Sequence, residues 1–378
     1  MGDADGNLLL ISESYNNADM YHTIGFLFSD PVIFLRHPAG TTLVCSNFER
    51  DEAAKHSKVR DVLSPEDLGS LELLDWNPHE AYAEQVRRLL RRYDVSDVTI
   101  TENTPVHVVD YLRAHGVTVT CDPDALLGIR IVKGPEEIAA IEAAQRATEQ
   151  AMRRAVEIIA ASEPRDGVLA YEGATLTAER LRAALDITLL EQECVCDGMI
   201  TACGPDAASP HNRGTGPLRP NQSIVLDIFP RHKSLRYFAD MTRTLSKGDQ
   251  GPEIRRMYDT TLQAQELALS LIRPGASGKA IYEAVCRLYE EAGYATSLRT
   301  GSLPSVGFSH GLGHGVGLEI HEKPGLSRRD DTLAVGHVVT VEPGLYDSRI
   351  GGVRIEDMVV VTEDGCRNLT NFEKQLVV

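Results

Sequence analysis

Short apolar runs alternate with amphipathic segments over the first 132 residues. Runs rich in β-branched and apolar residues occupy 32–37 (VIFLRH), 41–46 (TTLVCS) and 98–102 (VTITE). Between them, 79–93 (HEAYAEQVRRLLRRY) repeats its apolar residues at the spacing of a helix that buries one face. Alternation of strands and helices on this scale predicts a small α/β domain over residues 1–132.

A change of pattern near residue 134 indicates a second domain. The segment KGPEEIAAIEAAQRATEQ places Pro135 at the first helical position, acids directly after it, and apolar residues at helical spacing. Runs of β type follow, together with further helical patterns at about 177–191, 252–272 and 277–292. We therefore expect an α+β protein whose two domains are residues 1–132 and 133–378.

Four carboxylates interrupt apolar runs that otherwise have the pattern of buried strands. The runs are SIVLDIF, RYFADMTRTL, VVTVEPGLY and GVRIEDMVVV, and the acids are Asp227, Asp240, Glu342 and Glu356. For a single buried acid, an ion pair or backbone hydrogen bonds are the ordinary explanation. Four acids in strands that contain no lysine exceed what the nearby Arg243 and Arg354 can neutralise.

The spacing of the four acids predicts that they meet in pairs. A hairpin centred between residues 233 and 234 would place the two aspartates opposite each other, and a hairpin turning near Arg349 would do the same for the two glutamates. Each pair would then lie within about 5 Å, where like charges in a dry site need a compensating cation. Two divalent cations balance four acids, and oxygen-rich ligands favour Mn²⁺, Co²⁺ or Zn²⁺.

The glycine-rich stretch 308–322 (FSHGLGHGVGLEIHE) supplies a nitrogen ligand. His310 and His314 stand four residues apart, as in a helical zinc motif, but the four glycines would each cost about 1 kcal/mol in a helix. Glycines at this density instead let the backbone pass close to a ligand or metal. The stretch is therefore predicted to be a loop and strand that help to form a site.

Composition excludes several classes of protein. Asp and Glu outnumber Lys and Arg by 55 to 38, which argues against nucleic acid or an anionic membrane as partner, because both need a basic face. Apolar runs are too short for a membrane span and the N-terminus lacks a basic signal-peptide region, so we expect a cytoplasmic protein. Seven scattered cysteines without a C-x-x-C pair indicate buried thiols.

Five ordered motifs resemble the metal-site motifs of the pita-bread (M24) metallopeptidases, a family that includes prolidase, aminopeptidase P, methionine aminopeptidase and creatinase. The motifs are VLDIFP, ADMTRT, HGLGHGVGLEIHE, VEPGLY and GGVRIED, and the resemblance covers residues 134–378. It implies a pita-bread catalytic domain behind a small creatinase-N-like α/β domain. The N-terminal domain and the full set of ligands favour the Xaa-Pro dipeptidase and Xaa-Pro aminopeptidase branch.

The resemblance also implies a role for each site residue. Five would hold the metals: Asp227 chelating one ion, Asp240 and Glu356 bridging the two, and His314 and Glu342 completing the second. Four would act on the substrate: His211 at the mouth, His310 and His321 beside the scissile bond, and Arg354 orienting the bridging acids or the substrate carbonyl. Glu342 would also pass a proton from the attacking water to the leaving nitrogen.

The implied activity is hydrolysis of the Xaa-Pro bond, in dipeptides or at peptide N-termini, by a homodimer with two divalent ions, Mn²⁺ or Co²⁺ ahead of Zn²⁺. Two departures from the family pattern bear on substrate choice. The aspartates stand 13 residues apart, slightly more than is usual, and Phe229-Pro230 replace a glycine-containing turn. A relative acting on a non-peptide amide or a cyclic osmolyte, and a non-catalytic peptide-binding relative, stay open as alternatives.

Overall fold

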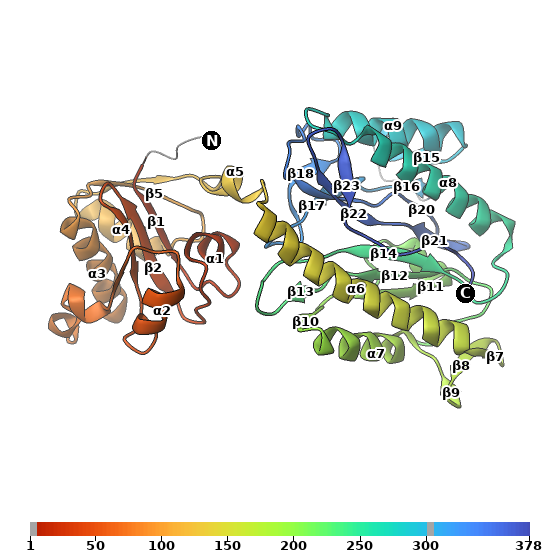
Figure 1. The fold of residues 1–378 in the computed structure, drawn as a ribbon, viewed down its shortest axis with the longest axis horizontal. Helices are drawn as coiled ribbons and strands as arrows, with labels where there is room; N and C mark the ends of the chain where they lie inside the picture. The colour runs from red at the N-terminus through yellow and green to blue at the C-terminus, as the bar shows by residue number, and fades with distance from the viewer. Residues whose placement is uncertain (1–5, 301–305) are drawn as a thin grey trace. The chain divides into compact units, whose positions relative to one another are not determined.

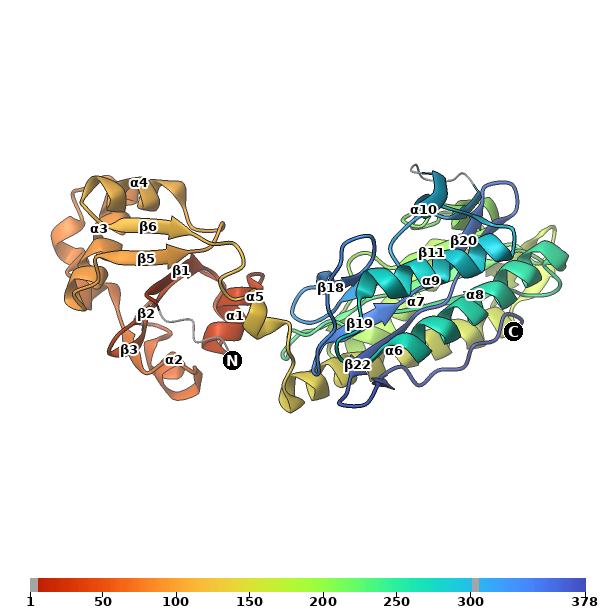
Figure 2. The same cartoon turned by 90° about the horizontal axis from the view of Figure 1, so that it is seen from above.

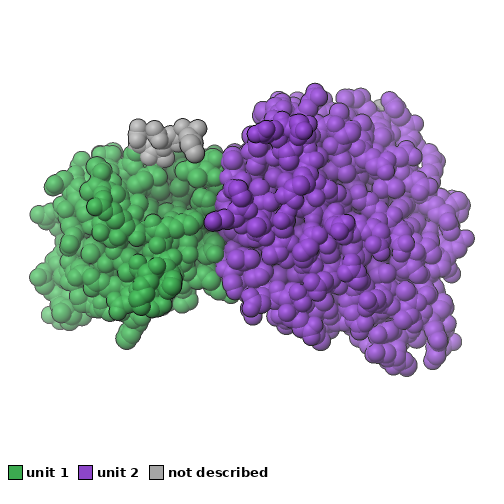
Figure 3. All heavy atoms as spheres, viewed as in Figure 1, with its two compact units in different colours: residues 1–130 green, residues 131–378 purple. Residues whose placement is uncertain are grey.

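The computed structural model of the protein describes residues 6–300 and 306–378. The chain divides into two compact units, Met1–Arg130 and Ile131–Val378 (Figure 3). The boundary expected from the sequence, between 132 and 133, lies two residues further along the chain. Within the described ranges, none of the helices is long and apolar enough to cross a membrane.

Unit 1 is a six-stranded sheet covered by helices on both faces. The strand order is β4-β3-β2-β1-β5-β6, antiparallel from β3 to β1 and parallel where β4, β5 and β6 are added. Leu9 and Ile11 of β1 pack with α3 and α4, whereas Leu8 and Leu10 pack with α1 and α2. Burial on both faces explains why the strands read as continuous apolar runs, and the predicted α/β fold is confirmed.

The elements of unit 1 have the following bounds. The strands are β1 (Leu8–Ser12), β2 (Val32–His37), β3 (Gly40–Val44), β4 (Asp61–Leu63), β5 (Asp97–Ile100) and β6 (Thr118–Cys121). The helices are α1 (Ala18–Ile24), α2 (Arg50–His56), α3 (Pro78–Arg92), α4 (Val106–Ala114) and α5 (Leu127–Arg130), with 3₁₀ turns at Pro65–Leu68 and Ser70–Leu73.

Unit 2 begins with the longest of the described helices, α6 (Pro135–Ala161). Pro135 occupies its first position, as predicted, and the Glu137 carboxylate accepts a hydrogen bond of 2.8 Å from the Gly134 N–H. This bond satisfies one of the amides that a helix start leaves unpaired. The other helices are α7 (Ala178–Glu191), α8 (Gly251–Leu271), α9 (Gly278–Glu291) and α10 (Ser297–Thr300), with a 3₁₀ turn at Gly204–Ala208.

The strands of unit 2 form three larger sheets and two small ones. The larger sheets are β11 (Ile200–Cys203), β12 (Ile224–Ile228) and β14 (Met241–Leu245); β15 (Ala295–Thr296), β16 (Val306–Phe308), β20 (Gly344–Asp347) and β21 (Gly351–Arg354); and β17 (Gly313–Gly315), β18 (Glu322–Leu326), β19 (Val338–Val341), β22 (Asp357–Val361) and β23 (Cys366–Asn368). The small ones are β7 (Glu163–Arg165), β8 (Val168–Tyr171) and β9 (Ala174–Thr175), and β10 (Cys194–Val195) with β13 (Arg231–His232).

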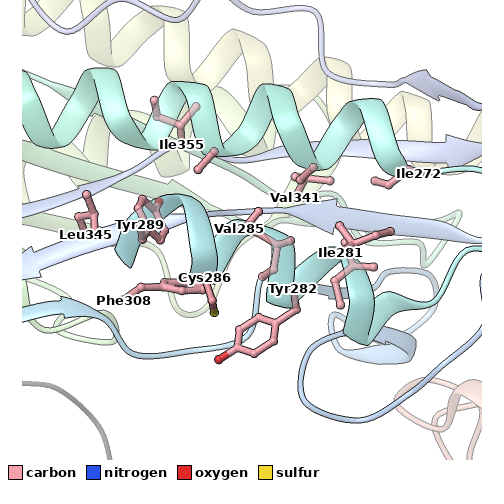
Figure 4. Close-up of a cluster of buried hydrophobic side chains, with 14 of the residues drawn as sticks. Ile272, Ile281, Tyr282, Val285, Cys286, Tyr289, Phe308, Val341, Leu345 and Ile355 are labelled. Atoms are coloured by element: carbon pink, nitrogen blue, oxygen red, sulfur yellow. The ribbon is translucent and has the colours of Figure 1, made fainter. Parts of the chain in front are cut away.

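Helices cover this layer of strands from two sides (Figures 1 and 2). Helices α6 and α7 bury their apolar stripes with β11, β12 and β14 in one cluster. Helices α8 and α9 form a second cluster with the strands around β19 to β22, including Tyr289, Phe308 and Val341 (Figure 4). Each cluster covers one face of its own strands, and side chains such as Asp227 project from the opposite face into a cavity.

The register of the second predicted hairpin is confirmed. Strand β20 pairs with β21 so that Gly344 lies opposite Arg354, and β19 pairs with β22 so that Val341 lies opposite Asp357. The second ladder continues the register of the first, and Glu342 and Glu356 stand opposite each other at the position between the two ladders. The two glutamates therefore face each other across the hairpin.

The register predicted for the first hairpin is wrong by two residues. Asp227 lies opposite Thr242, because the turn is centred between Ser234 and Leu235 and not one residue earlier. The ladder extends past β12 through the hydrogen bond from His232 N–H to Tyr237 O (3.0 Å), which fixes this longer register. A shift of two residues preserves the face of the sheet, so Asp240 still projects to the same side as Asp227.

Buried and exposed leucines on α7 give a matched test of this packing. Leu185 is fully buried in the cluster with β11 and β12, whereas Leu190 is 53% exposed on the same helix. We expect Leu185→Ala to lower the free energy of unfolding by about 2–5 kcal/mol through lost burial and a residual cavity. Leu190→Ala should change it by less than about 0.5 kcal/mol. Urea unfolding followed by circular dichroism measures both, and equal effects would contradict the packing described.

Candidate active site

A cavity of about 560 Å³ in unit 2 brings together all nine side chains singled out in the sequence. Their spread over the sequence, from 211 to 356, shows that the fold and not local spacing assembles the site. The nine residues are His211, Asp227, Asp240, His310, His314, His321, Glu342, Arg354 and Glu356. The rest of the lining is mostly small or apolar: Gly198, Ile200, Pro210, Arg213, Phe229, Gly311, Gly313 and Ile320.

Glu342 and Glu356 lie where the hairpin passes from one sheet to another. Strands β19 and β22 belong to the five-stranded sheet, and β20 and β21 belong to the four-stranded sheet. At the crossing, Glu342 N–H donates to Leu312 O (2.8 Å) and Glu356 N–H donates to Thr242 O (3.0 Å). Because Pro343 has no N–H, the runs read as single strands in the sequence are interrupted here, and both acids are held by neighbouring segments.

His314 presents an unprotonated ring nitrogen to two carboxylates. Its Nδ1 lies 3.1 Å from the carbonyl oxygen of Gly315, which can only accept, so Nδ1 carries the proton. The lone pair of Nε2 then faces Asp240 Oδ2 at 3.6 Å and Glu342 Oε1 at 3.5 Å. Burial lowers the pKa of His314, which favours this neutral form. The imidazole thus offers a lone pair beside two carboxyl groups, an arrangement suited to a cation.

Gly313 lets the strand that carries His314 approach its neighbour. A Cβ added at this position would lie 2.0 Å from the carbonyl oxygen of Thr340, a distance that backbone atoms cannot tolerate. The close approach allows His314 N–H to donate to Thr340 Oγ1 at 3.0 Å. The glycines of this stretch thus place the ligand strand, and the predicted loop and strand, without a helix, are confirmed.

Asp240 and Glu356 are the most deeply buried acids of the cavity, at 4% and 2% exposure. Burial raises the pKa of Asp240 well above its ordinary range, and the neighbouring carboxylates raise it further. Burial raises the pKa of Glu356 in the same way, and it raises the pKa of Glu342 to about 7. These shifts measure how strongly the protein alone disfavours charge at the cluster.

Arg354 is the buried cation of the cluster, and it contacts a different acid from the one expected. Its Nη2 lies 2.6 Å from Asp227 Oδ2, whereas its link to Glu356 runs through Thr242, which accepts from Arg354 Nε (3.1 Å) and donates to Glu356 Oε2 (2.8 Å). Arg354 thus reaches Glu356 only through the threonine, and its expected role in orienting the bridging acids stays a prediction. Thr340 donates to Glu342 in a similar way, at 3.4 Å.

A chain of hydrogen bonds fixes His310. Arg354 Nη1 donates to the hydroxyl oxygen of Tyr346 (3.1 Å), and that hydroxyl lies 2.8 Å from His310 Nε2. His310 Nδ1 lies 2.7 Å from the carbonyl oxygen of Gly311 and therefore carries the ring proton. Burial lowers the pKa of His310 to about 3, so Nε2 accepts from Tyr346. Both ring nitrogens are engaged within the protein.

His211 and His321 are exposed at the cavity and are the histidines available to a substrate. The ring of His321 stands edge-on to His314, with ring centres 4.4 Å apart. Tyr346, Thr242 and Thr340 complete the site and were not identified from the sequence. The two threonines could have been found in part from the alternation of side chains along a strand. Each threonine lies two residues from a predicted acid, so the two side chains share one face of the strand.

The donor set fits divalent cations. One ligand atom each from Asp240, His314 and Glu356 lie within 4.8 Å of one another. Among the described residues, Oδ1 of Asp227 and Oδ1 of Asp240 are buried without a hydrogen-bond partner. Buried carboxylate oxygens rarely remain unpaired, and a neutral imidazole between carboxylates is a common ligand arrangement for transition metals.

Comparison with known proteins places this site in a family. The model of metallopeptidase family M24 matches residues 139–363, more than half of the chain. The Xaa-Pro dipeptidase of Pyrococcus furiosus is 32% identical over 256 residues, which cover 67% of each chain. The Xaa-Pro dipeptidase of Pyrococcus horikoshii is 31% identical over a segment of the same length. The chain spans about two thirds of the length of these curated relatives.

Solved structures share the fold over nearly the whole chain. The X-Pro aminopeptidase from Thermotoga maritima has a TM-score of 0.79 at 25% identity, and the alignment covers 98% of this chain and 97% of that one. The prolidase from Pyrococcus horikoshii has a TM-score of 0.78 at 24% identity, with 98% and 95% covered. The predicted α+β pita-bread fold is confirmed. This protein is therefore a metallopeptidase that belongs to the metal-dependent family M24.

Proposed function

We propose that the protein is a two-metal peptidase that cleaves the bond before proline, in dipeptides or at the N-terminus of longer peptides. The observation that carries the proposal is the convergence of Asp240, His314 and Glu356, together with two carboxylate oxygens that have no hydrogen-bond partner among the described residues. The bond type is supported by similarity to a relative described as an Xaa-Pro dipeptidase. A homodimer and a cytoplasmic location stay predictions from the family resemblance.

Five side chains would hold the two ions: Asp227, Asp240, His314, Glu342 and Glu356. Divalent cations bound there would polarise the substrate carbonyl and lower the pKa of a water molecule. The oxygen-rich set with one imidazole favours Mn²⁺ or Co²⁺, with Zn²⁺ as the alternative. The carbonyl of Gly315 keeps the Nε2 lone pair of His314 directed at the ligand group.

Other side chains that line the cavity would transfer the proton and bind the substrate. Glu342 has a carboxylate on the cavity wall, where Oε1 and Oε2 can take a proton from the attacking water and return it to the leaving nitrogen. His211 and His321 are exposed there and can donate to the oxygen that gains negative charge. His310 has no nitrogen left for the substrate, so its role is to position Tyr346 and Arg354.

Removal of metal tests the core of the proposal. We expect purified protein to bind two divalent ions per chain, to lose Ala-Pro and Met-Pro hydrolysis after chelation, and to regain it with Mn²⁺ or Co²⁺. Metal content is measured by atomic emission and hydrolysis by release of free amino acid. Cleavage of a Xaa-Pro-containing tripeptide as well as the dipeptides would favour aminopeptidase activity. Cleavage of the dipeptides alone would favour dipeptidase activity. Full hydrolysis by metal-free protein would contradict the proposal.

A variant of Glu356 tests whether this residue binds metal and supports catalysis or has only a structural role. We expect Glu356→Gln to reduce bound metal from two ions per chain and to lower kcat/KM by at least about 100-fold, because a charged ligand becomes a neutral one. Glu363→Gln is the matched control, since Glu363 is exposed just after β22. A variant of Glu356 that keeps both metal content and activity would exclude the assigned role.

The hydroxyl of Tyr346 should matter to both stability and rate. We expect Tyr346→Phe to lower the free energy of unfolding by about 1–3 kcal/mol, because His310 and Arg354 lose a buried partner, and to lower kcat by about tenfold. Tyr258→Phe is the control, because the buried hydroxyl of Tyr258 has no hydrogen-bond partner among the described residues. Denaturant unfolding and steady-state kinetics measure the two effects, and equal behaviour of the two variants would refute the hydrogen-bond chain.

A further inference from the structure

Gln265 is a fully buried glutamine on α8, and its side chain bonds to both strands of the hairpin that carries Glu342 and Glu356. Its Nε2 donates to Val341 O (2.9 Å) and to Ile355 O (3.2 Å). The side chains of these two residues pack in one apolar cluster with α8 (Figure 4). An amide NH₂ group has two hydrogens, so each strand receives one of them.

The bond to Ile355 replaces one that the hairpin cannot form. Ile355 N–H donates to Pro343 O (3.4 Å). In a regular antiparallel ladder, the facing residue of such a pair returns a hydrogen bond from its own N–H to Ile355 O. Pro343 has no N–H, so the ladder leaves this oxygen without a donor. Gln265 donates to it instead, and the helix thereby supplies what the sheet crossing lacks.

The peptide groups that precede the two glutamates are held at both ends. A trans peptide group is planar, and its C=O and N–H point in opposite directions. The group before Glu342 accepts from Gln265 and donates to Leu312 O (2.8 Å). The group before Glu356 accepts from Gln265 and donates to Thr242 O (3.0 Å). Neither group can rotate without breaking a hydrogen bond, and the two share one donor residue.

The amide of Gln265 carries a cost that its two hydrogen bonds must offset. Both carbonyl oxygens can only accept, which places the nitrogen on their side. Oε1 of Gln265 is buried without a hydrogen-bond partner among the described residues, next to apolar residues such as Ala264 and Ala268. A buried, unpaired amide oxygen is unfavourable, and an apolar side chain would avoid it. The position therefore requires the two donors, and both act on the glutamate hairpin.

We propose that Gln265 is a positioning residue for divalent cations, because it fixes the separation of Glu342 and Glu356 through their backbone. The inference rests on the proposed two-metal site and deepens it. A carboxylate whose backbone can move loses conformational entropy when a cation orders it, which weakens binding. Loss of the amide donors should therefore weaken metal binding although all five ligands are kept.

The test is a calorimetric titration of Mn²⁺ into the full chain after its metal has been removed by chelation. Gln265→Met keeps a side chain of similar length and removes both donors. We expect it to raise the Kd of at least one Mn²⁺ ion by about 10- to 100-fold, as is typical when a residue that supports metal ligands is replaced. If Gln265→Met does not fold, Gln265→Glu takes its place. Its neutral form retains a single donor, so it should weaken Mn²⁺ binding as well.

Gln145→Met is the matched control. Gln145 is fully buried on α6, and its Oε1 also has no partner among the described residues. Its Nε2 donates to Thr370 Oγ1 (3.2 Å) and lies 3.8 Å from the sulfur of Met241, so both contacts are with side chains that are not metal ligands. We expect Gln145→Met to lower the Tm as Gln265→Met does. Its Kd for Mn²⁺ should stay within about twofold of wild type, because the Kd is measured on folded protein.

Two results would overturn the inference. One is Gln265→Met protein that binds Mn²⁺ as tightly as wild type. The other is an equal loss of affinity in Gln145→Met, which would assign the effect to general destabilisation.

Failure of the proposed function gives different results. Wild-type protein that binds two Mn²⁺ ions without cleaving Ala-Pro would exclude Xaa-Pro hydrolysis, whereas weaker binding by Gln265→Met would still support the positioning role. Wild-type protein that binds neither Mn²⁺ nor Co²⁺ would exclude both the two-metal site and the role of Gln265.

Discussion

Repulsion among carboxylates that are buried around His314 is the constraint on which the rest of unit 2 depends. Asp240 and Glu356 are almost fully buried, and the described cation in direct contact with this cluster, Arg354, is bound to Asp227. Charge at the cluster is disfavoured until a further cation arrives, so the last steps of folding and the binding of metal are linked equilibria. The threonines, the glycine of β17 and the crossing of two sheets together hold these side chains, and one ligand atom each from Asp240, His314 and Glu356 lie within 4.8 Å of one another.

The positions of the ligand side chains are fixed by backbone contacts of the segments that carry them and not by contacts among the ligands. Glu342 and Glu356 are held by amides that bond outside their own hairpin, to Leu312 and Thr242. His314 is held by the close contact of Gly313 with β19. Helices α6 and α7 pack on one group of these strands and helices α8 and α9 pack on the other, which limits how far the strands can move apart to relieve the repulsion. Backbone contacts of this kind restrict the movement of the side chains that they carry, which reduces the reorganisation needed when the substrate enters.

Features that depend on residues close together in the sequence could be predicted, whereas features that depend on distant residues could not. Helix α6 follows from apolar periodicity and from Pro135, and strands β2, β3 and β5 follow from apolar runs. The pairing of Glu342 with Glu356 follows from a short turn near Arg349. The turn between Asp227 and Asp240 is longer, so its centre was misplaced by one residue and the pairing by two. Tyr346 could not be identified, because its role depends on His310 and Arg354, which only tertiary structure brings to its hydroxyl.

The single register shared by the two ladders of the β19–β22 hairpin sets a limit on chain length. An insertion or deletion of one residue within β20 or β21 would turn one glutamate to the opposite face of its strand, while the other stayed in place. The tip of the first hairpin, 233–236, carries no site residue and lies beyond its ladder, so it can change in length by two residues without that consequence. Length variation among working relatives should therefore be absent from β20 and β21 and tolerated at the hairpin tips.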